Sequence, residues 1–259
     1  MKDLTIRTMS GFIIVLLTIA VTIKGGTTLL YFVAVLSILG LREFYNAIEG
    51  IDIEPIKSIG YIGCIGLLFN SMEYRWASFK LLFFYMLTML LIELLLKKDI
   101  ALIDIFITLF GILYIPFLMQ HIIYLDGNIY IWLIFITAWG TDTFAYIFGT
   151  LFGRKKLCPK LSPNKTIEGS LGGVFGAILL TFGFAKYFNL FPLWRLILLA
   201  IIGGVIAQLG DLTASRIKRI TGIKDFGFIM PGHGGVLDRF DSILFTAPLV
   251  YYYIKHFLL

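Results

Sequence analysis

The chain has 259 residues, of which 59% are hydrophobic and only 15% are charged, and its formal net charge is +6. Soluble domains usually contain about 25% charged residues, and the mean hydropathy of +0.91 is also far from that class. The composition therefore excludes an ordinary soluble enzyme and predicts an all-α polytopic membrane protein. No hydrophilic stretch is long enough for a separate soluble domain.

Apolar segments that are long enough to cross a bilayer, about 20 residues each, recur along almost the whole chain. The first has the charged start of a signal peptide, but it lacks a small-residue cleavage site and leads directly into further spans, so we expect it to be retained. We predict about nine transmembrane helices, at residues 9–23, 27–45, 57–71, 76–96, 101–124, 128–150, 167–187, 192–214 and 241–258.

The distribution of basic residues predicts how these helices are oriented. With nine spans, 16 of the 22 lysines and arginines lie on the same side as the N-terminus. Because cytoplasmic loops are enriched in Lys and Arg, we expect a cytoplasmic N-terminus and a C-terminus outside. A retained first helix without a targeting peptide suits a bacterial inner membrane.

The two halves of the chain differ in polarity. Residues 1–125 are mostly Leu, Ile and Phe and are predicted to form a transmembrane scaffold, whereas residues 126–259 are predicted to form the catalytic part. The charged loops 151–166 and 215–240 both fall on the predicted cytoplasmic side. We therefore expect the active site at that surface of the membrane.

The first of three polar clusters spans residues 137–157. Asp142 lies inside an apolar run, where a carboxylate is costly unless it faces a cavity or a partner. Lys155 and Lys156 follow soon after and favour an anion site. Two simpler interpretations stay open: Asp142 is hydrogen-bonded to a neighbouring helix, and the lysines are ordinary cytoplasmic loop charges.

The second cluster is LSPNKTIEGSLGGVFG, residues 161–176, and it contains the predicted start of a helix. Ser162 can cap a helix that begins at Pro163, and Thr166 offers an alternative cap one turn later. A helix N-terminus favours phosphate, and Lys165 adds a full positive charge at the same place. The glycines of this segment are spaced four apart, which favours close helix packing in lipid.

The third cluster is GDLTASRIKRITGIKDFGFIMPGHGGVLDRFDS, residues 210–242. If the preceding helix continues, Asp211, Ser215 and Lys218 lie on one face at i, i+4 and i+7. The segment PGHGG has too many Gly and Pro residues to be helical, and its backbone can approach a ligand closely. The loop brings three further aspartates back towards the membrane, namely Asp225, Asp238 and Asp241.

Carboxylates beside basic residues are typical of phosphoryl and nucleotidyl transfer. Mg²⁺ is usually held by one or two carboxylates together with waters and substrate phosphates, while Lys and Arg neutralise the phosphates. A zinc site is not favoured, because His233 is the only histidine in these clusters; it is a candidate phosphate contact, acid/base group or loop residue. The sequence has no P-loop, dinucleotide-binding glycine motif or GxSxG motif, so a bound nucleotide would occupy a membrane-embedded site.

The segment from Ser215 to Asp241, S-R-I-K-R-x4-K-D-F-G-x2-M-P-G-H-G-G-V-L-D-R-F-D, closely resembles the signature of the phosphatidate cytidylyltransferase (CDP-diacylglycerol synthase) family. The upstream elements TDTFAY and SPNKTIEG are also similar to those of the family, so the resemblance covers about residues 137–242. Asn164 stands where many members have a lysine, which removes one positive charge from this loop.

The resemblance implies transfer of the cytidylyl group from CTP to phosphatidate, giving CDP-diacylglycerol and pyrophosphate with Mg²⁺ required. It also implies a paired-metal centre with K⁺ beside the Mg²⁺, between Asp211 and Asp238. The residues by themselves do not single out these two over Asp225 or Asp241. A homodimer in the lipid bilayer is implied as well, and no nucleic-acid partner is expected.

Under this hypothesis the polar residues fall into two groups. One group would bind metal, hold phosphatidate and the leaving pyrophosphate, or act as acid or base, and consists of Asp211, Asp238, Lys218, Lys224, Asp225, His233 and Arg239. The other would bind the nucleotide and lipid substrates, and consists of Asp142, Lys155, Lys156, Ser162, Lys165, Thr166, Glu168, Ser215 and Arg219.

Two other functions compete with this interpretation. A CTP-dependent lipid kinase would move the γ-phosphoryl group to a polyprenol-like alcohol, with Asp225 or His233 as the base. A transporter with Asp142 in its pathway would have discontinuous helices in matched positions of two repeated halves. The halves of this chain are unlike, and its polar groups gather at one membrane face.

Overall fold

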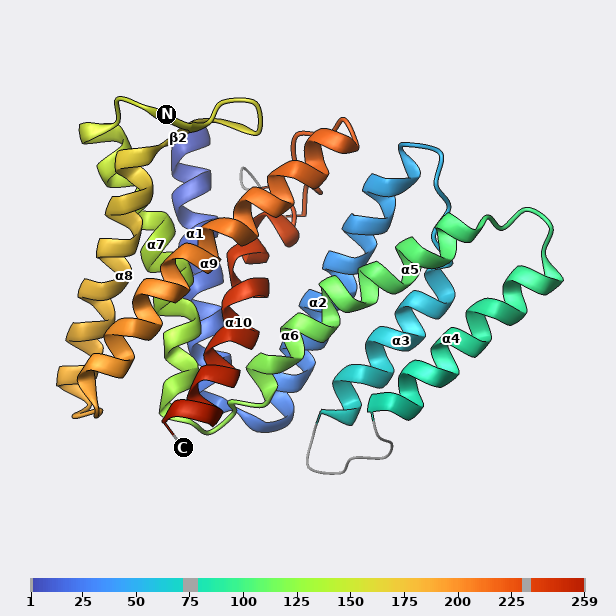
Figure 1. The fold of residues 1–259 in the computed structure, drawn as a ribbon, viewed down its shortest axis with the longest axis horizontal. Helices are drawn as coiled ribbons and strands as arrows, with labels where there is room; N and C mark the ends of the chain where they lie inside the picture. The colour runs from blue at the N-terminus through green and yellow to red at the C-terminus, as the bar shows by residue number, and fades with distance from the viewer. Residues whose placement is uncertain (1, 72–78, 230–233, 259) are drawn as a thin grey trace. The chain divides into compact units, whose positions relative to one another are not determined.

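The computed structural model describes residues 2–71, 79–229 and 234–258. Within these ranges the chain forms ten α-helices, one short 3-10 helix and one two-stranded sheet (Figure 1). The chain divides into two compact units. The N-terminal unit comprises Met1–Asp126 and Ile220–Arg239, and the C-terminal unit comprises Gly127–Arg219 and Phe240–Leu259.

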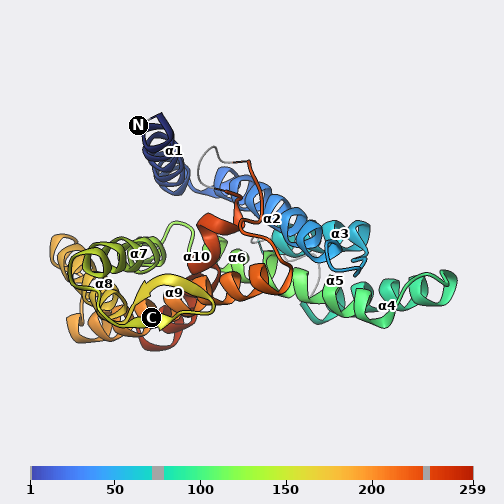
Figure 2. The ribbon, with the colours of Figure 1, turned by 90° about the horizontal axis from the view of Figure 1, so that it is seen from above.

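Among the described residues of the first half of the chain, six helices belong to the N-terminal unit. Of these, α3 packs against α2, α4 and α5 (Figures 1 and 2). The helices are α1 (Lys2–Lys24), α2 (Gly26–Glu49), α3 (Lys57–Asn70), α4 (Phe79–Leu96), α5 (Leu102–Tyr114) and α6 (Pro116–Ile123).

The core of the N-terminal unit is organised around Tyr45 on α2. Its ring is fully buried, and its hydroxyl donates to the Thr108 carbonyl on α5 at 2.9 Å. Gly60 on α3 and Gly111 on α5 leave room for the ring, since a Cβ at these positions would lie 2.5 and 2.6 Å from Tyr45 atoms. A large aromatic side chain thus joins three helices while its polar end is satisfied.

The predicted fifth span is not one continuous helix. It is divided at Ile115 into α5 and α6, and Pro116 occupies the first turn of α6. Proline has no backbone N–H and disfavours a helical conformation in the preceding residue, so a new helix begins there more easily than the old one continues.

The C-terminal unit is built around a close pair of helices, α7 and α8 (Figures 1 and 2). Most of α9 and α10 also belong to this unit. Its elements are η1 (Ile129–Ile131), α7 (Trp132–Phe152), β1 (Lys156–Cys158), β2 (Ser162–Thr166), α8 (Ile167–Tyr187), α9 (Leu193–Ile220) and α10 (Leu237–Phe257).

Glycines allow α7 and α8 to approach closely. A Cβ at Gly173 would lie 2.8 Å from the Thr141 carbonyl oxygen, and the faces of Gly172 and Gly176 lie directly against Phe148 and Phe144. The predicted packing role of the glycines in residues 161–176 is confirmed. In lipid, where apolar burial does not drive helix association, such contacts hold helices together.

A β-hairpin stands where the sequence suggested the start of a helix. β1 pairs antiparallel with β2, with Lys156 opposite Thr166 and Cys158 opposite Ser162. The expectation of a helix from Pro163 capped by Ser162 is therefore wrong. The alternative cap is confirmed, because the Thr166 hydroxyl accepts a hydrogen bond from the Gly169 N–H at 3.1 Å and α8 begins at Ile167.

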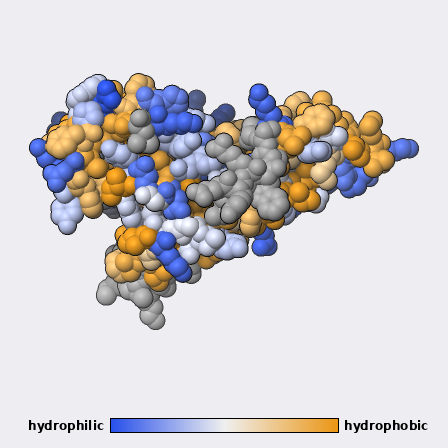
Figure 3. Space-filling view, turned by 90° about the horizontal axis from the view of Figure 1, so that it is seen from below, coloured by the Kyte–Doolittle hydropathy of each residue, from blue (hydrophilic) through white to orange (hydrophobic). Residues whose placement is uncertain are grey.

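By length and composition, five helical segments among the described residues are able to cross a membrane: Gly26–Glu49, Leu102–Ile123, Ile129–Phe152, Ile167–Tyr187 and Leu193–Ile220. Large hydrophobic side chains are exposed on both units (Figure 3), for example Leu95, Phe106 and Leu171. Exposed apolar helix surface of this extent indicates contact with lipid rather than water. The protein is a polytopic membrane protein.

Candidate active site

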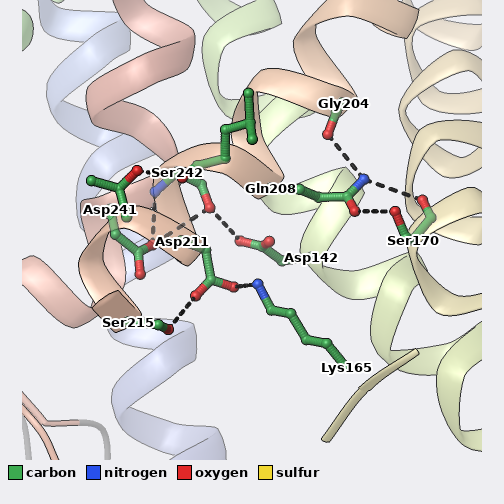
Figure 4. Close-up of polar contacts among 11 residues, drawn as sticks. Asp142, Lys165, Ser170, Gly204, Gln208, Asp211, Ser215, Asp241 and Ser242 are labelled. Carbon is green, nitrogen blue, oxygen red and sulfur yellow. Dashed lines mark hydrogen bonds and ion pairs between the residues drawn. The ribbon is translucent and has the colours of Figure 1, made fainter. Parts of the chain in front are cut away.

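The centre of the polar cluster in the C-terminal unit is Asp211 on α9 (Figure 4). One carboxylate oxygen forms an ion pair with Lys165 from β2, and the other accepts a hydrogen bond from the Ser215 hydroxyl at 3.4 Å. The predicted continuation of the helix through Ser215 is confirmed, since α9 extends to Ile220. The hairpin therefore brings its lysine to the acidic face of α9.

Two more carboxylates belong to the same cluster. The Ser242 hydroxyl on α10 lies 3.2 Å from an oxygen of Asp142 on α7 and 3.4 Å from one of Asp241, and it donates to one of them at a time (Figure 4). The Ser242 N–H donates to Asp241 at 2.7 Å. The simpler interpretation of Asp142, a hydrogen bond to a neighbouring helix, is thus confirmed by the contact with Ser242. Asp142 itself is exposed.

The charges of this cluster are unbalanced. Asp241 is only 8% exposed, and it interacts electrostatically with Asp211, Asp142 and the lysine Lys218. The cluster therefore holds three carboxylates, those of Asp142, Asp211 and Asp241, and two ammonium groups, those of Lys165 and Lys218. Carboxylate oxygens are the ligands that a hard cation such as Mg²⁺ selects, but among the described residues no three His, Cys, Asp or Glu side chains lie close enough together to hold a metal ion by themselves.

A hydrogen-bonded glutamine, which the sequence reasoning missed, joins α8 to α9 beside this cluster. The Gln208 amide donates to the carbonyls of Ser170 and Gly204, each at 3.1 Å, and accepts from the Ser170 hydroxyl (Figure 4). An uncharged amide within the apolar run of a predicted span was the available signal, since buried polar groups in lipid require partners.

The basic loop of residues 151–166 is connected to the start of α8 by Glu168. Its carboxylate accepts hydrogen bonds from the backbone N–H groups of Arg154 at 3.0 Å and Lys155 at 3.2 Å. The side chains of Lys155 and Lys156 are exposed. The loop backbone is therefore held while its cations remain accessible to an anion.

The end of α9 supplies further cations. Lys218 is half-buried and Arg219 is exposed, and the Arg219 guanidinium donates to the Leu161 carbonyl of the hairpin at 3.4 Å. In the N-terminal unit, Lys224 and Arg239 are exposed. The predicted phosphate-binding cations thus lie at the surface of their respective units, apart from the half-buried Lys165 and Lys218.

The described parts of the remaining signature segment, residues 220–229 and 234–239, belong to the N-terminal unit. One oxygen of Asp238, in the first turn of α10, accepts hydrogen bonds from the N–H groups of Phe226 at 2.8 Å and Gly235 at 2.9 Å. Gly234 has a positive φ of 85° and lies against Asp238 and Asp225. Only a residue without Cβ fits there easily. His233 lies outside the described residues.

A second residue that the sequence reasoning missed is Glu43 on α2. It is 4% exposed, and its two oxygens accept hydrogen bonds from the N–H groups of Val236 and Leu237, each at 2.9 Å. The only sequence signal was a carboxylate near the end of an apolar helix. Its partners lie more than 190 positions away in the sequence, too far for local reasoning.

Comparison with known proteins covers nearly the whole chain. Residues 5–257 match the sequence profile of the Cytidylyltransferase family. The chain is 38% identical to the phosphatidate cytidylyltransferase of Staphylococcus haemolyticus strain JCSC1435 over 254 residues, which cover 95% of this chain and 96% of that protein. It is 36% identical to the protein of the same name from Staphylococcus epidermidis strain RP62A over 255 residues, and 34% identical to that from Staphylococcus aureus strain COL over 255 residues, with the same coverage in each case.

The acidic and basic clusters that the fold assembles, the signature segment from Ser215 to Asp241, and this similarity along the chain lead to one conclusion: the protein belongs to the phosphatidate cytidylyltransferase family.

Proposed function

We propose that the protein transfers the cytidylyl group of CTP to phosphatidate at the membrane surface. The observation that carries this proposal is its identity of 34–38% to phosphatidate cytidylyltransferases over 95% of the chain. A phosphate oxygen of phosphatidate attacks the α-phosphorus of CTP and forms a new P–O–P linkage. The bond between the α-phosphorus and the bridging oxygen of the β-phosphate breaks, so the products are CDP-diacylglycerol and pyrophosphate.

The reaction requires no covalent intermediate on the protein. The nucleophile is already an anion, so the main task of the protein is to bring two negatively charged substrates together and to stabilise the charge of the transition state. In the C-terminal unit, we assign Lys155, Lys156 and Lys165 to the triphosphate. We assign Lys218, Arg219, Lys224 and Arg239 to phosphatidate and the leaving pyrophosphate.

We assign Asp211 and Asp238 as the residues that hold Mg²⁺, with K⁺ beside it. The ligand type supports this assignment, because both residues supply carboxylate oxygens, and Asp211 and Asp142 both interact electrostatically with Asp241. When bound, the metal would neutralise phosphate charge and polarise the reacting phosphorus. Lys165 forms an ion pair with Asp211, so the carboxylate lies beside a cation that is assigned to the triphosphate.

The placement in the membrane follows from the charge distribution. We place the N-terminus in the cytoplasm, nine spans in a bacterial inner membrane, and the active site at the cytoplasmic surface, where CTP is available. The 16:6 bias of basic residues supports this orientation. A homodimer is proposed on the resemblance to the family alone.

The decisive experiment follows the two ends of the triphosphate separately. Purified protein in detergent is given phosphatidate, Mg²⁺ and CTP labelled at either the α- or the γ-phosphorus. The proposal requires α-label in the lipid and γ-label in pyrophosphate. Transfer of γ-label to an added polyprenol would instead establish a lipid kinase, and no transfer of either label to any lipid would refute both.

A further inference from the structure

The buried carboxylate of Glu43 is a feature of the N-terminal unit that the reaction chemistry does not require. It comes from α2, in the part of the chain that the sequence suggested was only scaffold, and it is 4% exposed. All the partners described above for its oxygens are backbone N–H groups of the segment that carries Asp238. A buried carboxylate is costly without such partners, so this contact calls for an explanation.

The contact supplies hydrogen-bond acceptors to backbone N–H groups at the start of α10. The first N–H groups of a helix have no partner within it, and Ser, Thr, Asp or Asn just before the helix usually supplies an acceptor. Here that position is Val236, whose side chain has no acceptor. Glu43 supplies acceptors from another helix instead, to the N–H of Val236 just before α10 and to that of Leu237, its first residue, at 2.9 Å each.

The loop backbone encloses this carboxylate. A Cβ at either Gly227 or Gly235 would lie 2.5 Å from Glu43 carboxylate atoms. One turn earlier on α2, Gly40 contacts the Leu237 side chain, where a Cβ would lie 3.2 Å from a Leu237 methyl group. The two ends of the loop are therefore seated on one short stretch of α2.

Asp238 and Glu43 divide the amides of this turn between them. The Gly235 N–H donates to Asp238, and the next two N–H groups donate to Glu43. The two carboxylates also interact electrostatically, so a cation at Asp238 would meet a more negative potential than Asp238 alone provides. Because these three amides are occupied by carboxylates, the start of α10 is arranged to hold Asp238 rather than to bind phosphate.

We propose that Glu43 is a positioning residue that fixes the first turn of α10, and through it the Asp238 carboxylate, for cytidylyl transfer. This inference rests on the proposed function for the role of Asp238. Glu43 is nearly fully buried, so its role is to determine where Asp238 points by holding the backbone that carries it. The effect of removing a partner that orients a metal ligand is typically a loss of about 10- to 100-fold in affinity or activity.

The test compares Glu43→Gln with Glu49→Gln, a matched change on the same helix. Glu49 is exposed and pairs with Lys57 at 2.8 Å, away from the loop. Glutamine keeps one acceptor but faces one of the two N–H groups with its own NH₂. We expect kcat to fall about 10- to 100-fold in Glu43→Gln, with the KM for phosphatidate within about threefold, while Glu49→Gln matches the unmodified protein.

Hydrogen exchange provides a readout independent of activity. In Glu43→Gln the amides of Val236 and Leu237 should exchange faster, while helices away from the loop keep their protection. Glu43→Asp retains the charge on a shorter side chain and should recover part of kcat. A kcat for Glu43→Gln equal to that of Glu49→Gln overturns the inference, as does faster exchange throughout the protein with no local effect in residues 235–238.

If Glu43→Gln cannot be purified in folded form, Gly227→Ala carries the test, because its methyl group would meet the Glu43 carboxylate without altering it. Full activity of Gly227→Ala refutes the inference, and a fall in kcat with faster exchange of the Val236 and Leu237 amides supports it. Failure of the proposed function is recognised separately. In that case the unmodified protein transfers no cytidylyl group, whereas the exchange of the Val236 and Leu237 amides still reports the contact.

Discussion

At the scale of single residues, each carboxylate of the signature region has a different environment. Asp238 accepts two backbone N–H groups through one oxygen, Asp211 pairs with a lysine, and Asp241 is buried with a serine beside it. The side chains of the Lys165–Asp211 pair are 27% and 26% exposed, and pairs near the surface contribute only about 0–1 kcal/mol to stability. This pair therefore contributes little to the stability of the fold.

The first prediction separates the charge of Asp238 from its role in closing the loop. Asp238→Asn keeps an oxygen that can accept from Phe226 and Gly235 but removes the negative charge. We expect cytidylyl transfer to fall more than about 100-fold, because even the outer partners of metal ligands affect activity by 10- to 100-fold. Asp99→Asn, at an exposed loop position, is the control. Full activity of Asp238→Asn with intact membrane insertion would eliminate the metal assignment.

At the scale of elements, two arrangements place the site residues of the C-terminal unit. The β-hairpin carries Lys165 to α9, and Thr166 ends the hairpin and caps α8 at once. The close approach of α7 and α8 holds Thr141, and beside it Asp142, near the unit's polar cluster. Small residues at this contact are a condition for the site as well as for packing.

The second prediction concerns the contact of α7 with α8. Gly173→Ala would place a methyl group 2.8 Å from the Thr141 carbonyl oxygen, so the helices must move apart, and overpacking of this kind typically costs about 1–3 kcal/mol. Gly183→Ala on the same helix meets no atom within 4 Å and should be neutral or stabilising by up to about 1 kcal/mol. Thermal unfolding in detergent would compare the two. Equal midpoints for both variants would contradict the packing role.

At the scale of the whole molecule, the balance of apolar surface and basic loops determines how the chain lies in the membrane. In the part of the chain that the structure describes, five segments are long and apolar enough to span a membrane, and the remaining predicted spans correspond to α1, α3, α4 and α10. Of these, α3 has only 14 residues, fewer than the roughly 20 that a bilayer crossing needs. The number of spans, and with it the side of the membrane on which each loop lies, can therefore be tested loop by loop.

The third prediction tests the nine-span orientation with reporter fusions. A periplasmic phosphatase joined after Asp99, in the loop following the fourth predicted span, should be inactive because that loop is cytoplasmic. The same enzyme joined after Asp126 or at the C-terminus should be active. An active fusion at both Asp99 and Asp126 would show that the intervening segment does not cross the membrane, and the span count would have to be revised.

Much of the secondary structure could be predicted because its cause is local. The segment 167–187 matches α8 at both ends, and 57–71 and 192–214 locate α3 and α9 with shifts at their ends. The hairpin was missed because the Ser-Pro pair of SPNKT resembles the start of a capped helix. A short strand is stabilised by its pairing with another strand, here residues 156–158, and that pairing is not visible in the five residues themselves. The interruption at Pro116 was missed because hydropathy alone does not register a lost N–H.

The sequence by itself determined that this is a membrane protein, where most of its helices lie, and which family it belongs to, because apolar length, charge bias and the signature segment can be read without knowing which residues meet in space. Only the tertiary structure decided that Lys165 pairs with Asp211, that Ser242 joins Asp142 to Asp241, and that Glu43 holds the start of α10. The reason is physical: a buried polar group must find a partner wherever folding brings one, and distance along the chain does not limit where that partner lies.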